Sequence, residues 1–137
     1  MANYYTQMSM AVSGTPEELK WLETLLGKPE SRDSAMLAVL TELDDNGEDS
    51  FLGLTTEYVD GELCIYSEEN FDVDALAIAL QGWLRDFNIT RQVYFTWASF
   101  CDKPVTNEFN GGACIVDKDN MQWLHTSEWV QNNLRKD

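Results

Sequence analysis

The dipeptide Asp60-Gly61 constrains the fold of this 137-residue chain more than any other feature, because it stands between two runs of strand-forming residues. Two-residue Asp-Gly connections favour a type I′ turn, whose backbone twist matches that of two paired antiparallel strands. The runs on either side, residues 51–59 and 62–67, are rich in β-branched and aromatic residues, which are typical of strands. The sequence therefore predicts an antiparallel hairpin over residues 51–67.

The two-residue turn also fixes which side chains of the hairpin share a face. It sets Tyr58 opposite Leu63 and Thr56 opposite Ile65, and directly opposed residues of an antiparallel pair point to the same side. The predicted core face carries Leu52, Leu54, Tyr58, Leu63 and Ile65, and the opposite face carries Glu57, Glu62 and Tyr66.

Two helices have clear start signals. The segment 15–18 combines a capping threonine, a proline at the first helical position and a glutamate three residues after the cap. These features predict a helix over 16–26, which Gly27 ends because glycine accepts the left-handed conformation. Asn70 or Asp72 caps a later helix whose apolar residues recur at helical spacing.

The remaining elements are predicted from shorter patterns. Residues 34–43 have apolar side chains at helical spacing, but they are too few to exclude a strand over 38–43, and we favour the helix. The other segments are predicted as strands over 4–13, 91–100 and 113–116, a glycine-containing loop over 107–112 and a last helix over 126–134.

The order of these elements predicts the fold class. With the ambiguous segment 34–43 set aside, the chain begins with the order βαββαβ, which is the ferredoxin-like order, and a strand and a helix follow. A length of 137 residues and 44% hydrophobic residues suit one folded domain with its own core. We therefore predict a single α+β domain over 1–137, with an antiparallel sheet, helices on one face and a C-terminal strand-helix addition.

Negative charge is concentrated in residues 33–84. This stretch of 52 residues contains 13 Asp and Glu and no Lys or Arg, whereas the rest of the chain contains 11 acids and 9 bases. The stretch therefore carries −13 of the formal net charge of −15. Like charges on one small domain repel one another in the folded state. Two interpretations stay open: an acidic face that keeps the protein in solution, and an acidic face directed at a basic partner.

Cysteine usage and the N-terminal segment predict the compartment. Cys64, Cys101 and Cys114 are odd in number and not closely spaced, which fits neither a disulfide framework nor a paired-cysteine zinc site. Residues 1–14 lack the basic and apolar regions of a signal peptide, and no apolar run is long enough for a membrane span. We expect a cytoplasmic protein that binds no membrane and folds without metal, disulfide or cofactor.

No catalytic motif is present, and the residues that offer an alternative site are scattered. His125 is the only histidine, and no partner stands at a spacing that identifies a catalytic triad. Cys101, beside Lys103, is either a stabilised thiolate or, as we favour, a small buried side chain. Gly111 and Gly112 lack the spacing of phosphate-binding loops. These five residues are the candidate site of a small enzyme or ligand-binding domain, and we favour a non-enzymatic protein.

Four tryptophans divide into two predicted groups. Trp83 and Trp97 fall on predicted apolar faces and are expected in the core. Trp123 and Trp129 flank His125, where a core position is favoured over an exposed aromatic patch.

Three segments in the second half of the chain carry a resemblance to known proteins. They are Trp97-Ala98-Ser99-Phe100-Cys101-Asp102-Lys103-Pro104, Phe109-Asn110-Gly111-Gly112-Ala113 and Thr126-Ser127-Glu128-Trp129. The chain is similar here to small uncharacterised proteins of bacteria, phages and plasmids that have a ferredoxin-like fold. The resemblance implies that fold and a phage or mobile-element setting, and it implies no activity. The acidity also resembles that of nucleic-acid mimics that phages use against host defence.

The leading functional hypothesis is a non-enzymatic inhibitor that occupies the basic groove of a host nucleic-acid-binding protein of a defence system. Such grooves gain affinity by neutralising negative charge, and a folded acidic surface can compete for them. Direct binding to nucleic acid is disfavoured because the net charge opposes phosphate approach. The alternatives are the enzyme or ligand-binding domain above, and a structural interaction module without a basic partner. The predicted partner-binding carboxylates are those of Asp44, Asp45, Glu48, Asp49, Glu57, Glu62, Glu68 and Glu69.

Overall fold

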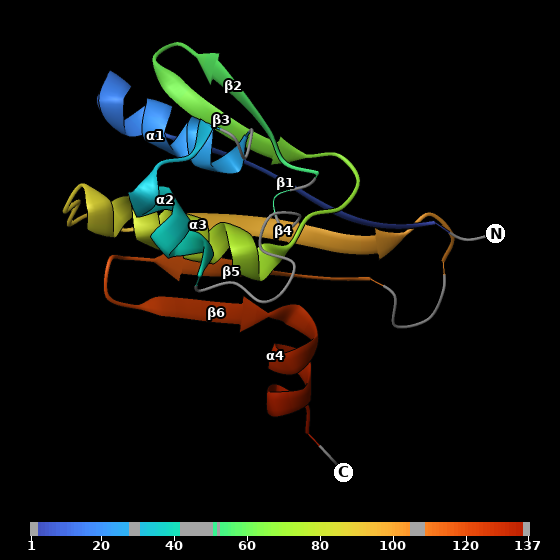
Figure 1. Cartoon of the computed structure of the whole chain (residues 1–137). Helices are drawn as coiled ribbons and strands as arrows, with labels where there is room; N and C mark the ends of the chain where they lie inside the picture. The colour runs from blue at the N-terminus through green and yellow to red at the C-terminus, as the bar shows by residue number, and fades with distance from the viewer. Residues whose placement is uncertain (1–2, 28–30, 42–50, 52, 105–108, 136–137) are drawn as a thin grey trace.

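A computed structural model describes residues 3–27, 31–41, 51, 53–104 and 109–135. Within these residues the chain forms six strands and four helices, and all six strands belong to one antiparallel sheet (Figure 1). The elements are β1 (Tyr4–Val12), α1 (Pro16–Leu26), α2 (Ser34–Leu40), β2 (Thr55–Val59), β3 (Glu62–Ser67), α3 (Val73–Asp86), β4 (Val93–Cys101), β5 (Asn110–Val116), β6 (Met121–His125) and α4 (Thr126–Asn133).

The predicted α+β class is confirmed, but the element order is not βαββαβ. Residues 34–40 form α2, so the helix favoured for this segment is present and lies between α1 and β2. After β4 the chain adds β5, β6 and α4, where only one strand and a helix were predicted. The missed strand, β6, is five residues long, and its position is fixed by pairing with β5 rather than by local pattern.

The sheet has the strand order β2-β3-β1-β4-β5-β6, so the N-terminal strand lies inside it. β1 pairs with β3 through the register Val12 opposite Leu63, and with β4 through Tyr4 opposite Cys101. The amide N–H of Asn3 extends the second pairing by donating to a carboxylate oxygen of Asp102 at 2.9 Å.

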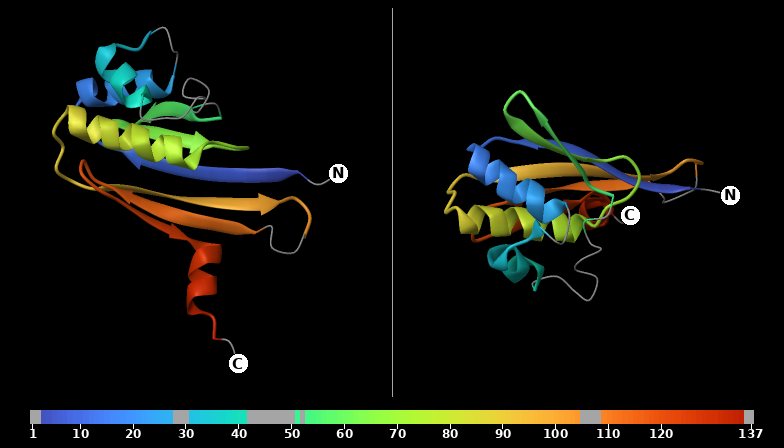
Figure 2. Two further views of the ribbon diagram at one scale, coloured as in Figure 1. Left: turned by 60° about the horizontal axis from the view of Figure 1, so that its bottom comes forward. Right: turned by 45° about the horizontal axis from the view of Figure 1, so that its top comes forward.

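Helices cover one face of the sheet. α1 and α3 pack against each other on that face and α2 packs on α3, as the views in Figures 1 and 2 show. The alternate side chains of the strands that point toward these helices are buried. We call the other side of the sheet the open face, because no helix covers it in the part of the chain that the structure describes. The most deeply buried side chains of the core are Leu22, Leu25, Leu63, Ile65, Leu76, Leu80, Trp83, Leu84, Phe95, Cys114 and Val116.

The predicted helix starts are confirmed. The Thr15 hydroxyl accepts from the Glu18 N–H at 3.2 Å, and a Glu18 carboxylate oxygen accepts from the Thr15 N–H at 2.8 Å, which completes a capping box. Asp72, one of the two caps predicted for the later helix, accepts from the Ala75 N–H at 3.0 Å at the start of α3. Both α1 and α3 therefore begin where side-chain oxygens satisfy their first amides.

The hairpin pairs as predicted, with Tyr58 opposite Leu63. Asp60 has φ 52° and Gly61 has φ 81°, the two positive values that a type I′ turn requires. One part of the prediction is wrong, since β2 begins at Thr55 rather than at residue 51. Tyr58 lies on the same face as buried Leu63, as predicted, but it is half-exposed because β2 is an edge strand of the sheet. Leu52, also predicted on the core face, lies outside the described residues.

Replacing Gly61 by Val should lower the free energy of unfolding by about 1–3 kcal/mol, because a β-branched residue resists positive φ. A side chain at this position meets no atom within 4 Å, so the cost is conformational and not a collision. Urea denaturation measures the loss. Gly61→Asn is the control, since asparagine tolerates the left-handed region and should lose much less. Equal stability of the Val variant and the parent would contradict the turn type.

Candidate functional site

The eight predicted partner-binding carboxylates are divided between described and undescribed parts of the chain. Asp44, Asp45, Glu48 and Asp49 lie outside the described residues. The other four, Glu57, Glu62, Glu68 and Glu69, are all exposed.

Glu57 and Glu62 lie close together at the turn end of the hairpin. Val59 is opposite Glu62 and Glu57 is opposite Cys64, so both carboxylates belong to the open face. They are diagonal neighbours on adjacent strands, a relation that places side chains roughly 7–8 Å apart. The backbone pairing of β2 and β3 therefore sets their separation.

Glu68 and Glu69 lie at the opposite end of β3, where the chain continues alongside β1. The Thr6 N–H donates to the Glu69 carbonyl at 2.7 Å, and the Gln7 side-chain amide donates to the Glu68 carbonyl at 2.6 Å. Glu68 lines an open-face hollow of about 510 Å³ together with Tyr66. From Glu62 to Glu68 is roughly 20 Å at the usual rise of a strand. The carboxylates thus form two groups along one hairpin and not one compact cluster.

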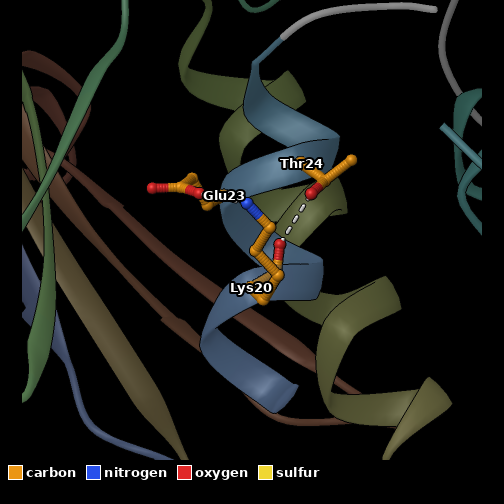
Figure 3. Close-up of polar contacts among 3 residues, drawn as sticks. All are labelled: Lys20, Glu23 and Thr24. Carbon is orange, nitrogen blue, oxygen red and sulfur yellow. Dashed lines mark hydrogen bonds and ion pairs between the residues drawn. The ribbon is translucent and has the colours of Figure 1, made fainter. Parts of the chain in front are cut away.

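None of these four carboxylates forms an ion pair in the part of the chain that the structure describes. An ion pair does form in α1, where Lys20 Nζ lies 3.3 Å from Glu23 Oε1 (Figure 3). In the same close-up, the Thr24 hydroxyl donates to the Lys20 carbonyl at 2.8 Å. The four hairpin carboxylates therefore keep their negative charge available to solvent or to a partner.

Titratable side chains near the hairpin and in the core show shifted pKa values. Burial, followed by the Glu23 carboxylate, raises the pKa of Tyr58, and Lys20 opposes the shift. Burial and then the Asp74 carboxylate raise the pKa of Cys114 to about 11, so this thiol stays neutral at physiological pH. Neither shift prepares a nucleophile, because each favours the protonated form.

Beside the hairpin, the open face carries polar and aromatic side chains of β1 and β4. Tyr5 stacks on Phe100 with ring centroids 5.5 Å apart, and Tyr94 is largely exposed. A hollow of about 280 Å³ has Glu62, Arg91 and Tyr94 among its lining residues. Shallow hollows with aromatic and polar linings suit contact with another macromolecule more than enclosure of a small substrate.

The structure does not assemble the alternative enzyme site. Cys101 is buried, and its thiol donates to Asp102 Oδ1 at 3.9 Å. His125 is level with Trp97 across the sheet, and Cys101 lies four residues further along β4, roughly 13 Å away in the strand direction alone. Lys103 is exposed beyond the end of β4. A thiol and a base so far apart cannot act on one bond.

The two glycines of the alternative site have a packing role. Gly111 and Gly112 lie within β5, so the predicted loop over 107–112 is wrong for residues 110–112. A Cβ at Gly111 would lie 2.6 Å from the Trp97 carbonyl oxygen. One at Gly112 would collide with the Leu124 carbonyl oxygen and lie 2.6 Å from the Trp97 ring. The glycines permit close approach of neighbouring strands and of an aromatic ring, which is the role of glycine inside a sheet.

An aromatic cluster surrounds Gly112, and the sequence did not predict it. Trp97 meets Trp123 edge-on at 6.0 Å and His125 at 5.5 Å, and Trp123 stacks on His125 at 5.8 Å with an interplanar angle of 10°. Trp97 and Trp123 are half-buried, where core positions were predicted, and Trp129 is exposed on α4. The missed signal was the alternation of Met121, Trp123 and His125, which places three side chains on one face of a strand.

Neither a metal-binding cluster nor a membrane-spanning helix is found in the described part of the chain. No group of three or more His, Cys, Asp or Glu side chains there is arranged to hold a metal ion. No helix there is long and apolar enough to cross a membrane. Comparisons with protein-family models, with curated proteins and with solved structures find no match to this chain.

Proposed function

We propose that this chain is a non-enzymatic binding protein that inhibits a host nucleic-acid-binding protein by occupying its basic groove. The observation that carries the proposal is a set of exposed hairpin carboxylates that form no ion pair with any residue the structure describes: Glu57, Glu62, Glu68 and Glu69. A groove that binds phosphates gains affinity by neutralising negative charge, so an acidic protein surface competes for it.

The rigidity of the hairpin supports this function. The pairing of β2 with β3 and of β3 with β1 holds Glu57 and Glu62 on paired strands of the sheet, and not on a flexible tail. A surface held in its binding geometry loses little conformational entropy when a partner docks. The stretch 33–84 also contains the four further predicted carboxylates, Asp44, Asp45, Glu48 and Asp49, which add to its negative charge.

The assignment of a ferredoxin-like fold is part of the same proposal. The strand order β2-β3-β1-β4, with α1 and α3 on one face, supports a ferredoxin-like core to which β5, β6 and α4 are added. Together with the acidity of the chain, this core favours assigning the chain to the cytoplasmic proteins of phages or mobile elements that act against host defence. The enzyme alternative is not favoured, because Cys101 and His125 are far apart.

Neutralising Glu57, Glu62, Glu68 and Glu69 together to Gln should slow association with the partner by about tenfold, because steering by charge acts mainly on the association rate. Folding should be unchanged or slightly improved, since repulsion falls. The partner is first captured from host lysate at low salt, eluted at high salt and shown to lose nucleic-acid binding when the chain is added. Stopped-flow association with that purified partner then measures the effect.

A matched control removes the same number of charges elsewhere. Glu17, Asp86, Asp119 and Glu128 lie outside the acidic stretch. Neutralising these four to amides should reduce the association rate much less. An equal reduction in both variants would show that only total charge matters and would reject the hairpin surface. A second variant, Cys101→Ser with His125→Ala, should leave binding nearly unchanged, and loss of function there alone would favour the enzyme.

A further inference from the structure

The C-terminal helix α4 projects from the end of β6, beyond the edge of the sheet (Figures 1 and 2). None of its residues is buried. Trp129, Val130 and Leu134 are 56%, 48% and 66% exposed, and Phe109 beside the helix is 57% exposed. Phe109 and Val130 line an open groove of about 660 Å³. An amphipathic helix normally buries its apolar residues, so this one has a surface without a partner inside the described chain.

The strand that leads into α4 is an edge strand without charge. β6 pairs with β5 on one side only, and its residues 121–125 include no Asp, Glu, Lys or Arg. The other edge strand, β2, carries Glu57. Natural sheets block unwanted pairing by placing charges, prolines or bulges on their edges. β6 therefore presents unpaired backbone groups to which another strand can add.

The charge distribution favours a second copy of this chain at this edge. Residues 109–135 contain three acids and two bases, a net charge of −1, whereas residues 33–84 carry −13. Two chains of net charge −15 repel each other least when their nearly neutral ends meet. A basic partner would be drawn to the acidic stretch instead.

We propose that two copies of this chain associate through β6 and α4, with the β6 strands antiparallel about a two-fold axis. Each α4 then packs its apolar side chains against the β6–α4 region of the other copy. The same surface on both chains meets itself, as a two-fold interface requires. The sheet becomes continuous through the pair, and the uncharged edge is removed from solvent.

The exposed apolar area supplies more than half of what such an interface needs. Applying the exposed fractions to Phe109, Leu124, Trp129, Val130 and Leu134 leaves roughly 500 Å² per chain, if a large side chain contributes about 150–250 Å². A stable interface buries about 800 Å² per partner. The strand edge and the polar rim of the groove supply the rest.

Sedimentation velocity of the native chain tests the proposal. The expected result is a species of twice 15.7 kDa, with a dissociation constant of roughly 10 µM or tighter. Amide hydrogen exchange of β6 should accelerate on dilution, while the exposed edge of β2 should not change. A chain that sediments as a 15.7 kDa monomer, or that binds only another protein or vesicles through α4, would overturn the proposal.

Two variants and one control assign the contact. Trp129→Ser with Leu134→Ser should shift the sample to monomer without loss of folding, because α4 has no buried residue. Leu124→Lys places a charge on the edge strand and should do the same. Leu37→Ser with Tyr94→Ser removes two exposed apolar side chains elsewhere and should leave the dimer intact. A dimer that survives both test variants, or that the control abolishes, contradicts the proposed contact.

Discussion

Replacing Trp83 by Ala should lower the free energy of unfolding by about 3–5 kcal/mol, among the largest effects expected of a single change in this protein. Trp83 is fully buried on α3, and its indole N–H donates to the Glu18 carbonyl of α1 at 2.8 Å. The guanidinium of Arg91 lies 5.7 Å from the ring centroid. The substitution therefore leaves a cavity and removes a hydrogen bond between the two helices that cover the sheet.

Trp83→Phe separates the two parts of this loss. The phenyl ring fills much of the cavity, so the remaining deficit reports the indole hydrogen bond and should be close to 1 kcal/mol beyond the smaller volume change. Chemical denaturation of both variants beside the parent gives the comparison. A loss below 1 kcal/mol for the alanine variant would mean that α1 and α3 do not meet at this residue.

Replacing Gly112 by Val should cost about 3 kcal/mol or more, because overpacking at a close strand contact forces the backbone to move. The new side chain would collide with the Leu124 carbonyl oxygen and the Trp97 ring. We expect β6 to be displaced and the near-ultraviolet circular dichroism of the Trp97–Trp123 pair to decrease.

Ala113→Val is the matched control for this glycine. Ala113 is the next residue of β5 and lies on the open face, so a valine side chain at this position points away from the Trp97 ring. The change should alter stability by about 0.5 kcal/mol or less. If Gly112→Val behaves like this control, the register of β5 with β6 is wrong.

The elements that the sequence predicted correctly are specified by residues that are adjacent or nearly adjacent in the chain. Asp60-Gly61 requires two positive φ angles at neighbouring positions, and it fixed the pairing of Tyr58 with Leu63. Thr15 and Asp72 cap helices whose first amides are three residues away. Such turns and caps depend only on residues close together in the sequence, so they can be predicted from the sequence alone.

The elements predicted poorly depend on contacts between distant segments. Gly111 and Gly112 were assigned to a loop because paired glycines usually permit turns, but their role is set by Trp97 on the neighbouring strand. β6 has only five residues, too few for a clear period, and it exists because β5 offers an edge. The alternation of Met121, Trp123 and His125 was a local signal for β6, but it was too short to specify the strand without its partner.

The negative charge of the candidate site could be predicted from the sequence, but the positions of its carboxylates relative to one another could not. The excess of carboxylates in 33–84 is a property of composition, and four of these residues, Glu57, Glu62, Glu68 and Glu69, are exposed. Their division between the two ends of the hairpin follows from strand direction and register, which are three-dimensional properties. The sequence therefore indicated a negative field without its shape.

The position of β1 inside the sheet has a consequence for how the protein is made. β1 is synthesised before the other five strands of its sheet, yet Asn3 beside it hydrogen-bonds to a residue 99 positions later in the chain. At about 5–20 residues per second, the ribosome takes several seconds or more to deliver β4. Met8 and Val12 have no complete sheet to enter during that interval. The nascent chain is therefore most vulnerable to aggregation before β4 emerges, and the large sequence separation of this pairing should make refolding slow for a domain of this size.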